Sequence, residues 1–140
     1  MRRSFDEARK WTDPKVVVDH LEFKENEPIN NFVCIVDRLN NQVHALFCQN
    51  YVRVFTSKSS NDGQSFTAPQ EITHYFEPLR QLYPWRVIAV GPGHSIQLST
   101  GRLLASLWMS EGTGTEFVPN RLGQRPSELS VVYSDDYCET

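Results

Sequence analysis

The sequence is poor in cysteine and lacks the usual spacings of metal ligands. Its 140 residues contain three cysteines, Cys34, Cys48 and Cys138, so they cannot all pair within one chain. Cys34 and Cys48 lie inside apolar runs, where a thiol behaves as a small hydrophobic side chain. The sequence has no CxxC, no His/Cys cluster and no HExxH. We therefore expect no protein-ligated metal and no cofactor.

Long apolar segments and an excess of positive charge are also missing. No stretch approaches the roughly 18 apolar residues of a membrane span, and the beginning of the chain has no apolar block typical of a signal peptide. Lys plus Arg number 14 against 17 for Asp plus Glu, a balance that disfavours nucleic acid as a partner. We expect a soluble chain without a membrane span, and the sequence leaves its localisation undetermined.

What the sequence does contain is the composition of an ordinary globular protein, with 39% hydrophobic and 11% aromatic residues. Short apolar runs, mostly of period two, predict strands. They cover residues 15–18, 32–36, 43–48, 52–55, 86–90, 95–98, 103–108 and 129–133. A helical turn is predicted around residues 77–82, and Pro84 ends it. Many strands with tight turns and no long helix indicate an all-β sandwich, barrel or propeller.

An internal repeat favours the propeller. Residues 32–66 form a meander of short strands that closes with a polar turn, and residues 95–140 repeat this order. A degenerate third copy of the closing turn stands at residues 4–11. The second unit is longer, and we assign its insertion to residues 112–126. Each copy of about four strands is the size of one propeller blade.

The repeated turn follows the pattern Ser-x-Asp-x-Gly-x-Thr-Trp. An Asp or Asn side chain closes such a turn by bonding the backbone, and Gly takes the left-handed position. The three copies lie at about residues 4–11, 59–66 and 134–140. The residues to which we assign a structural role in these turns are Ser4, Asp6, Trp11, Ser59, Asn61, Gly63, Phe66, Ser134 and Asp136.

This repeated turn resembles the Asp box of sialidases and other BNR-repeat propellers. A second segment, Ala-Val-Gly-Pro-Gly-His-Ser-Ile-Gln-Leu at residues 89–98 followed by Gly-Arg-Leu-Leu at 101–104, resembles a motif of exo-α-sialidases (neuraminidases). Residues 31–37 resemble a third family segment, with Phe32 in place of its first proline. The resemblance implies that residues 1–140 are a partial domain, about two to three blades of a six-bladed β-propeller.

The resemblance also implies an activity, the hydrolysis of terminal sialic acid from glycoproteins, glycolipids and oligosaccharides. Family members use a Tyr nucleophile with a Glu, an Asp acid/base and three clamping arginines. By the order of the motifs these groups fall outside this chain. The resemblance therefore implies a fragment with no catalytic residue, inactive alone, with sialylated glycans as the substrate. We expect its open blade edges to promote self-association. The alternative is a non-catalytic BNR-repeat propeller that binds glycans or proteins.

Five residues are candidates for the rim of a substrate pocket, and each has a structural alternative. Asn31 matches a family asparagine near polar groups of the sugar, or is a turn residue at the start of a strand. His94 follows a Gly-Pro-Gly turn and bonds ligand hydroxyls or caps its own strand. Trp108 and Ser110 match positions on the glycerol side of the ligand, although a core role is equally expected for Trp108. For Arg53 a surface salt bridge is the favoured alternative.

Overall fold

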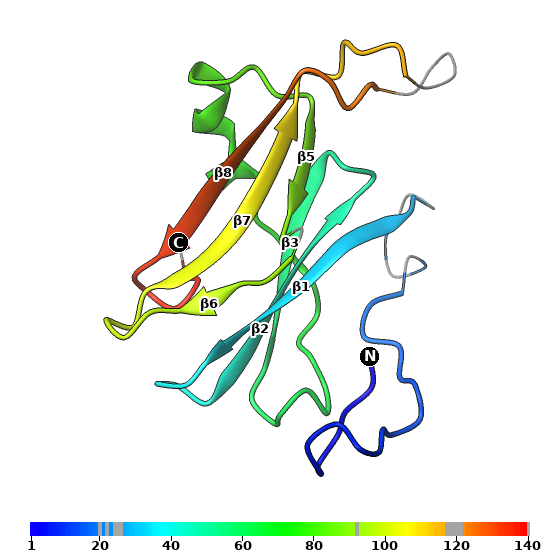
Figure 1. The fold of residues 1–140 in the computed structure, drawn as a ribbon, viewed down its shortest axis with the longest axis vertical. Helices are drawn as coiled ribbons and strands as arrows, with labels where there is room; N and C mark the ends of the chain where they lie inside the picture. Colours follow the sequence, from blue (N-terminus) through cyan, green and yellow to red (C-terminus); the bar gives the residue numbers. More distant parts are fainter. Residues whose placement is uncertain (20, 22, 24–26, 92, 117–121, 140) are drawn as a thin grey trace.

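Two antiparallel sheets form the body of the chain and pack face to face (Figure 1). The structure is a computed structural model that describes residues 1–19, 21, 23, 27–91, 93–116 and 122–139. The first sheet is a meander in which β1 (Ile29–Asp37), β2 (Gln42–Gln49), β3 (Arg53–Ser59) and β4 (Gln70–Glu71) pair in chain order. The apolar runs at 32–36, 43–48 and 52–55 therefore predicted three of these strands.

The second sheet consists of β5 (Val87–Val90), β6 (Ile96–Gln97), β7 (Leu103–Ser110) and β8 (Ser127–Ser134). β5 pairs with one half of β7 and β6 with the other half, while β8 pairs along the whole length of β7. β5 and β6 are therefore two parts of one interrupted strand, and the second sheet is three strands wide. Residues 117–121 of the predicted insertion lie outside the described residues.

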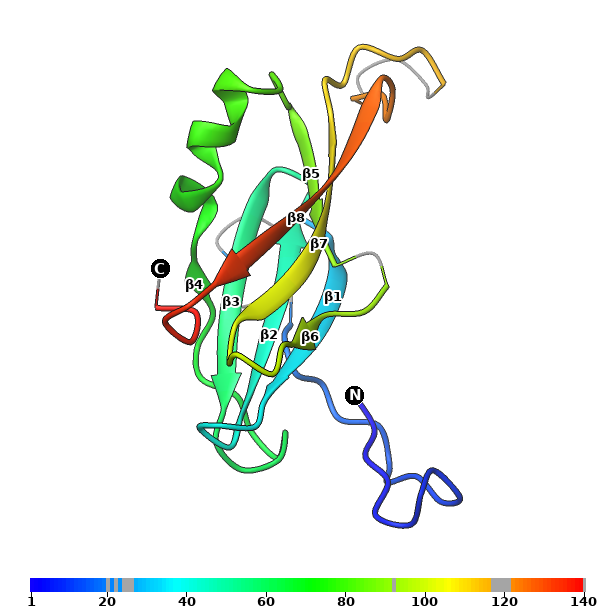
Figure 2. The same ribbon diagram turned by 60° about the vertical axis from the view of Figure 1, so that its left-hand side comes forward.

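Two short helical segments, η2 (Thr73–Tyr75) and η3 (Glu77–Gln81), connect the sheets (Figure 2). They confirm the helical turn expected at 77–82. The expected strand at residues 15–18 is wrong, because this segment pairs with no strand. No described strand edge lies beside this segment to pair with it, so its apolar pattern was not enough to form a strand. None of the helices described in the structure is long and apolar enough to cross a membrane.

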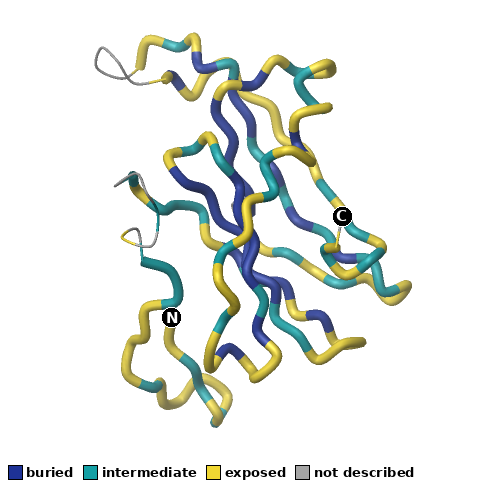
Figure 3. The backbone as a smooth tube through the Cα atoms, turned by 180° about the vertical axis from the view of Figure 1, so that it is seen from behind, coloured by how far each residue is buried: buried dark blue, intermediate teal, exposed yellow. Residues whose placement is uncertain are grey.

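The core lies where the facing sides of the two sheets meet (Figure 3). Val33, Ile35, Leu46 and Val54 project from the first sheet. Alternate residues of the second sheet meet them, because successive side chains of a strand point to opposite faces; these are Ile88, Val90, Leu103, Ala105, Leu107 and Met109.

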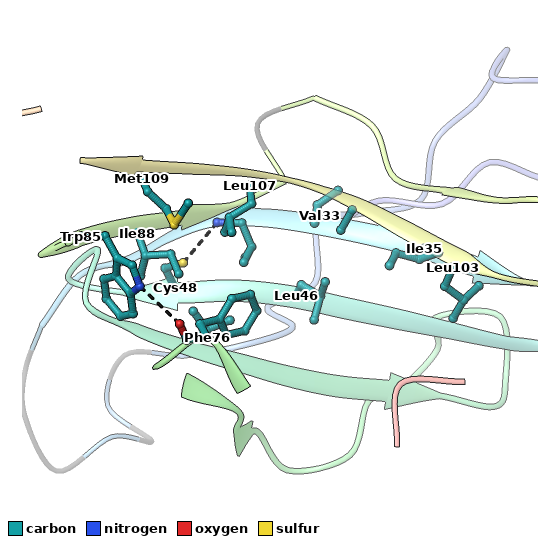
Figure 4. Packing of buried hydrophobic residues seen from close by; sticks show 13 residues of the cluster. Val33, Ile35, Leu46, Cys48, Phe76, Trp85, Ile88, Leu103, Leu107 and Met109 are labelled. Carbon is teal, nitrogen blue, oxygen red and sulfur yellow. Dashed lines mark hydrogen bonds between the residues drawn. The ribbon is translucent and has the colours of Figure 1, made fainter. Parts of the chain in front are cut away.

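One end of this core is closed by the segment between the sheets (Figure 4). The indole nitrogen of the fully buried Trp85 donates to the carbonyl of Phe76 over 3.3 Å. This bond satisfies the one polar group of the indole, so the ring is buried without an orphaned donor. Segment 73–85 thereby fixes the relative position of the two sheets at this end.

The second face of the first sheet is covered by the N-terminal part of the chain. Phe47 and Phe55 stack on neighbouring strands with ring centroids 5.7 Å apart, and Phe32 stacks on Phe47 at 6.1 Å. Phe23 meets Phe55 edge-on at 4.9 Å. Both faces of the first sheet are therefore buried along β2 and β3, and the burial of six consecutive residues at the end of β2 reflects this.

The three repeated turns share one hydrogen-bond pattern. In the second, Ser59 donates to the amide oxygen of Asn61 over 3.0 Å and accepts from the N–H of Gly63 over 2.9 Å. In the third, Ser134 donates to the carboxylate of Asp136 over 2.7 Å. In the same turn, the hydroxyl of Ser134 accepts from the N–H of Cys138. In the first turn, Ser4 donates to the carboxylate of Asp6 and accepts from the N–H of Ala8. Equal local geometry at three places is what an internal repeat predicts.

Candidate functional site

The two innermost strands, β1 and β5–β6, lie against each other, and each is irregular at the place where they meet. The register of β1 shifts between Asn30 and Val33, and Asn31 takes a φ of 54°. Between β5 and β6 the chain leaves the ladder at Gly91, whose φ is 68°. A Cβ on Gly91 would lie 2.2 Å from Val33 Cγ1. The absence of a side chain at Gly91 therefore allows the two irregular segments to approach closely.

This region, which we call the inner wall (residues 29–33, 90, 91 and 93–95), holds several unpartnered polar atoms. Both amide atoms of Asn30, Oδ1 of Asn31 and Oγ of Ser95 are buried and have no hydrogen-bond partner among the described residues. A buried polar group without a partner costs about 1–3 kcal/mol. Buried polar groups without a protein partner are typically found where a ligand or an ordered water supplies the missing bonds.

His94 lies on the exposed side of the inner wall, next to Ser95. A Cβ on the preceding Gly93 would meet no atom within 4 Å, so the space beside His94 is open. Pro92 of the same motif lies outside the described residues. Amides, a hydroxyl and an imidazole both donate and accept hydrogen bonds, so the wall is suited to a ligand rich in hydroxyl groups.

Arg53 lies at the start of β3 and is held by its own sheet. Its Nη2 lies 2.6 Å from Oε2 of Glu71, and its Nη1 donates to the Gln49 side chain over 3.0 Å. The hydrogen bond from Arg53 lowers the pKa of Glu71. The guanidinium also covers the ring of Phe55. These contacts place Arg53 on the phenylalanine-covered face of the first sheet rather than on the inner wall.

Trp108 and Ser110 lie near the end of β7. Trp108 is half-buried and alternates with the core residues Leu107 and Met109, so it projects from the opposite face of the second sheet. Ser110 is fully buried; its hydroxyl donates to the carbonyl of Gly123 over 3.2 Å and accepts from the N–H of Gly112 over 3.1 Å. The structure thus places Asn31 on β1 and His94 between β5 and β6, on two strands that lie side by side, while Trp108, Ser110 and Arg53 lie on other elements.

The repeated turns lie far along the strands from the start of β1. Asn31 stands near the beginning of β1, beside Cys48 and Gln49 at the end of β2. The second turn starts at Ser59, the last residue of β3. Ser59 pairs with Val43 at the beginning of β2. The serine turns therefore occupy the other end of the sheet and do not contribute to the inner wall.

A second polar group lies between the sheets, at the end of the core near the repeated turns. Asp37 is fully buried and accepts from Gln97 Nε2 and from Asn40 Nδ2, each over 2.8 Å. Burial tends to raise the pKa of Asp37, but the bonds from Asn40 and Gln97 outweigh it and hold the pKa below its usual value. Gln97 thereby links the second sheet to the β1–β2 turn of the first.

His44 belongs to the same group. It is fully buried, and its Nε2 lies 3.7 Å from Oδ2 of Asp37, too far for a hydrogen bond. Burial lowers the pKa of His44, and the positive charge of Lys58 acts in the same direction. The imidazole is therefore neutral near pH 7. Among the residues that the structure describes, no group of three His, Cys, Asp or Glu side chains is arranged to hold a metal ion.

The sequence did not point to Asn30, Ser95 or Gln97. Asn30 forms a doublet with Asn31 directly before an apolar run, a signal that could have drawn attention to both amides. Ser95 and Gln97 stand inside the segment 89–98 that resembles a family motif, but their roles depend on β1, which is distant in the sequence. Only the packing of the two sheets reveals them.

Comparison with known proteins supports one family. No family model matches the chain. Human Sialidase-3 is 28% identical over 112 residues, which cover 75% of this chain and 24% of that protein. Rat (Rattus norvegicus) Sialidase-3 is 32% identical over 73 residues, which cover 52% of this chain and 17% of that protein. The chain thus matches about a quarter or less of the length of these relatives.

The fold is similar to a solved structure, the Hadza microbial sialidase Hz136. The superposition has a TM-score of 0.79 and 16% sequence identity, and it covers 99% of this chain and 29% of that one. At this identity the likeness shows the fold. The expected fold class, part of a β-propeller of the sialidase type, is therefore confirmed.

Proposed function

This chain is a sialidase-family polypeptide that carries part of a sialidase-type β-propeller, and on that premise we propose that its inner wall forms one side of the pocket for a terminal sialic acid. The reaction would be the hydrolysis of sialic acid from glycoconjugates. The chain would contribute binding groups, and residues outside it would contribute the nucleophile, the acid/base and the arginine clamp.

The observation that carries this proposal is the group of unpartnered polar atoms on the inner wall. Asn31 Oδ1 is buried without a partner within a segment that resembles a family motif, and Val33 of the same segment lies against Gly91 of the second such segment. A sugar with several hydroxyl groups would supply the missing partners to Asn31 and Ser95, and His94 would bond a further hydroxyl from the exposed side. Binding would thereby recover part of the cost of burying these groups.

The other candidate residues would have supporting roles. Arg53 is engaged with Glu71, so it would hold the loop between β2 and β3 rather than clamp a carboxylate. Ser110 would fix the turn at Gly112 through its two hydrogen bonds. Trp108 would offer its half-buried ring from the outer face of the second sheet.

A second candidate function is a non-catalytic propeller that binds glycans. The observation that favours it is the chemistry of the inner wall itself, whose unpartnered atoms belong to amides and a hydroxyl, while the one arginine among the candidates is paired within its own sheet. Such a wall would bind hydroxyl groups whether or not the protein catalyses hydrolysis. Turnover of a sialoside separates the two functions.

The test uses the longest reading frame that contains this chain, expressed and assayed against a fluorogenic sialoside, with the 140-residue chain beside it. We expect turnover by the longer product and none by the 140-residue chain. Asn31→Gly removes the amide but suits the positive φ, so we expect it to reduce kcat/KM about tenfold or more through the loss of buried hydrogen bonds.

Asn41→Gly is the matched control, because Asn41 has a φ of 53° in an exposed turn between β1 and β2. It should leave kcat/KM unchanged. Equal effects of the two variants would contradict the role of Asn31. Binding of the sialoside without turnover by the longer product would establish the second candidate, and the absence of both binding and turnover would contradict both.

A further inference from the structure

The second repeated turn contains a pair of residues, Asp62 and Gly63, whose backbone can rearrange chemically. It is the one place in the sequence where Gly follows an Asp or an Asn. Asp62 is exposed, and both residues have a positive φ, 55° and 74°. The backbone nitrogen of a residue that follows Asp can attack the Asp side-chain carboxyl, and Gly has no side chain that would hinder the approach. The pair is therefore a potential site of isoaspartate formation.

The reaction has two steps and uses only the chain and solvent water. In the first, the backbone nitrogen of Gly63 loses its proton and bonds to Cγ of Asp62. The C–OH bond of the carboxyl breaks, one water leaves, and a five-membered succinimide forms. In the second step, a water adds to a ring carbonyl and the C–N bond at that carbonyl breaks. When this is the main-chain carbonyl, the backbone then runs through Cβ and Cγ of Asp62, which is an isoaspartate.

The folded turn protects the nitrogen that the first step needs. The N–H of Gly63 is buried and donates to Oγ of Ser59 over 2.9 Å. Met1 covers the same position, because a Cβ on Gly63 would lie 2.9 Å from Met1 Cε. A buried and bonded N–H is shielded from the base that must remove its proton, and it is released only when the turn opens. The carboxyl of Asp62 is thus accessible to solvent, whereas the nitrogen of Gly63 is not.

The other two repeated turns share the protecting bond but not the reactive pair. In each, the serine hydroxyl accepts the N–H of the fourth residue after it, over 2.9 Å in the first turn and 2.8 Å in the third. The residues in the place of Asp62 are Glu7 and Tyr137. A Glu would have to close a larger ring, and a Tyr has no carboxyl. The third turn therefore serves as a control for the chemistry of the second.

We propose that Asp62-Gly63 is a site of isoaspartate formation, that the hydrogen bond to Ser59 prevents the reaction in the folded chain, and that local opening of the second turn allows it. The modification would then accumulate in chains whose second turn has opened. It is independent of any activity towards sialosides.

An isoaspartate would also prevent the turn from closing again. It adds one carbon to the main chain between residues that the turn holds together. Asn61 bonds both the backbone N–H and the hydroxyl of Ser65, each over 2.9 Å, across this point. The Lys15 ammonium donates to the carbonyl of Gln64 and so connects the N-terminal segment to the turn. A longer backbone cannot keep all of these bonds, so the modification would loosen the N-terminal segment.

The test incubates the 140-residue chain at neutral pH in water labelled with oxygen-18 and follows the peptide that contains Asp62 by mass spectrometry. The second step incorporates one labelled oxygen for each succinimide that opens, and an isoaspartyl methyltransferase measures the isoaspartate. We expect the folded chain to react at least about tenfold more slowly than the same chain in denaturant. Asp62→Glu should abolish the label in this peptide under both conditions.

Ser59→Ala removes the acceptor of the Gly63 N–H, so we expect it to speed labelling of the folded chain about tenfold. Ser134→Ala is the matched control, because it removes the same bond from the third turn and should leave the rate at Asp62 unchanged. Cooperative thermal unfolding shows that each variant is folded.

A second measurement uses the parent chain alone, so it does not depend on the folding of a variant. Low concentrations of denaturant, below the unfolding transition, raise the rate of hydrogen exchange at the Gly63 N–H, and labelling at Asp62 should rise in proportion. Equal labelling of folded and unfolded chains, equal acceleration by the two serine variants, or labelling that does not follow this exchange rate would overturn the proposal.

Discussion

Gln97 of the second sheet donates from its side-chain amide to the buried carboxylate of Asp37 in the first sheet, over 2.8 Å. Its amide oxygen also accepts from the backbone N–H of Arg38 over 2.9 Å. One side chain thus joins the two sheets at the end near the serine turns. Because Asp37 is fully buried, the loss of this bond would leave a buried carboxylate with fewer donors.

We expect Gln97→Met to lower the free energy of unfolding by about 1–3 kcal/mol, because it keeps the volume of the side chain but removes its hydrogen bonds to Asp37, Arg38 and Gly101. Chemical denaturation measures this change. Ser99→Ala, in the exposed turn after β6, is the control and should stay within about 0.5 kcal/mol of the parent chain. A Gln97→Met variant as stable as the parent would show that the bond does not join the sheets.

His44 predicts a pH dependence of stability. Its pKa in the folded chain is lowered below the usual value of about 6.5 for histidine, mainly by burial. The unfolded chain therefore binds a proton at His44 more readily than the folded chain. The free energy of unfolding should be constant above about pH 6.5 and fall as the pH decreases below it. The lowered pKa of Asp37 acts in the same direction at more acidic pH.

Replacing His44 by Leu should remove the fall in stability between about pH 6.5 and 5, measured by denaturation at a series of pH values. His74→Leu is the control, because His74 is exposed. If His44→Leu kept the full decrease in this range, the burial of a neutral imidazole would not be its cause.

The inner wall leaves no room for a side chain at position 91. Gly91→Ala would place a Cβ 2.2 Å from Val33 Cγ1 at a positive φ, and we expect a loss of about 3 kcal/mol or more in the free energy of unfolding. Gly93→Ala has the strained φ but meets no atom, so its loss should be about 1–2 kcal/mol. Adding Val33→Ala should recover part of the Gly91→Ala loss; no recovery would show that this contact is not the cause.

The repeated turns predict opposite effects at equivalent positions. Ala8 and Gly63 both follow their serine by four residues and have φ values of 67° and 74°. Ala8→Gly relieves the left-handed strain at an exposed site and should stabilise the chain by up to about 1 kcal/mol, whereas Gly63→Ala should destabilise it by about 1–2 kcal/mol. Thermal unfolding of both variants measures this. The same sign for both would contradict the equivalence of the turns.

The strands and turns were predictable from the sequence because their signals are local. Alternating apolar residues predicted β2 and β7 within two residues of their ends, and the repeated turn pattern predicted that the Asn61 side chain bonds the backbone, as it does at Ser65. The segment 15–18 shows the limit of this reasoning, since apolar residues form a strand only where a partner edge is available.

The candidate site was predictable only in part. Asn31 and His94 stand in segments that resemble family motifs, and the structure places these segments on two adjacent strands. Their close approach depends on the contact of Gly91 with Val33, which joins residues almost 60 positions apart. The engagement of Arg53 by Glu71 is likewise set by the return of the chain along β3, which no local pattern encodes.

The most direct test of the account is a titration of the isotope-labelled 140-residue chain with 3′-sialyllactose, with lactose as the control ligand. We predict saturable shifts of the side-chain amide signals of Asn30 and Asn31 with the sialoside and no saturable shift with lactose. In the Asn31→Gly variant, the remaining Asn30 signal should no longer shift with the sialoside. Equal shifts with lactose, or sialoside shifts confined to residues away from the inner wall, would contradict the claim that this wall binds a terminal sialic acid.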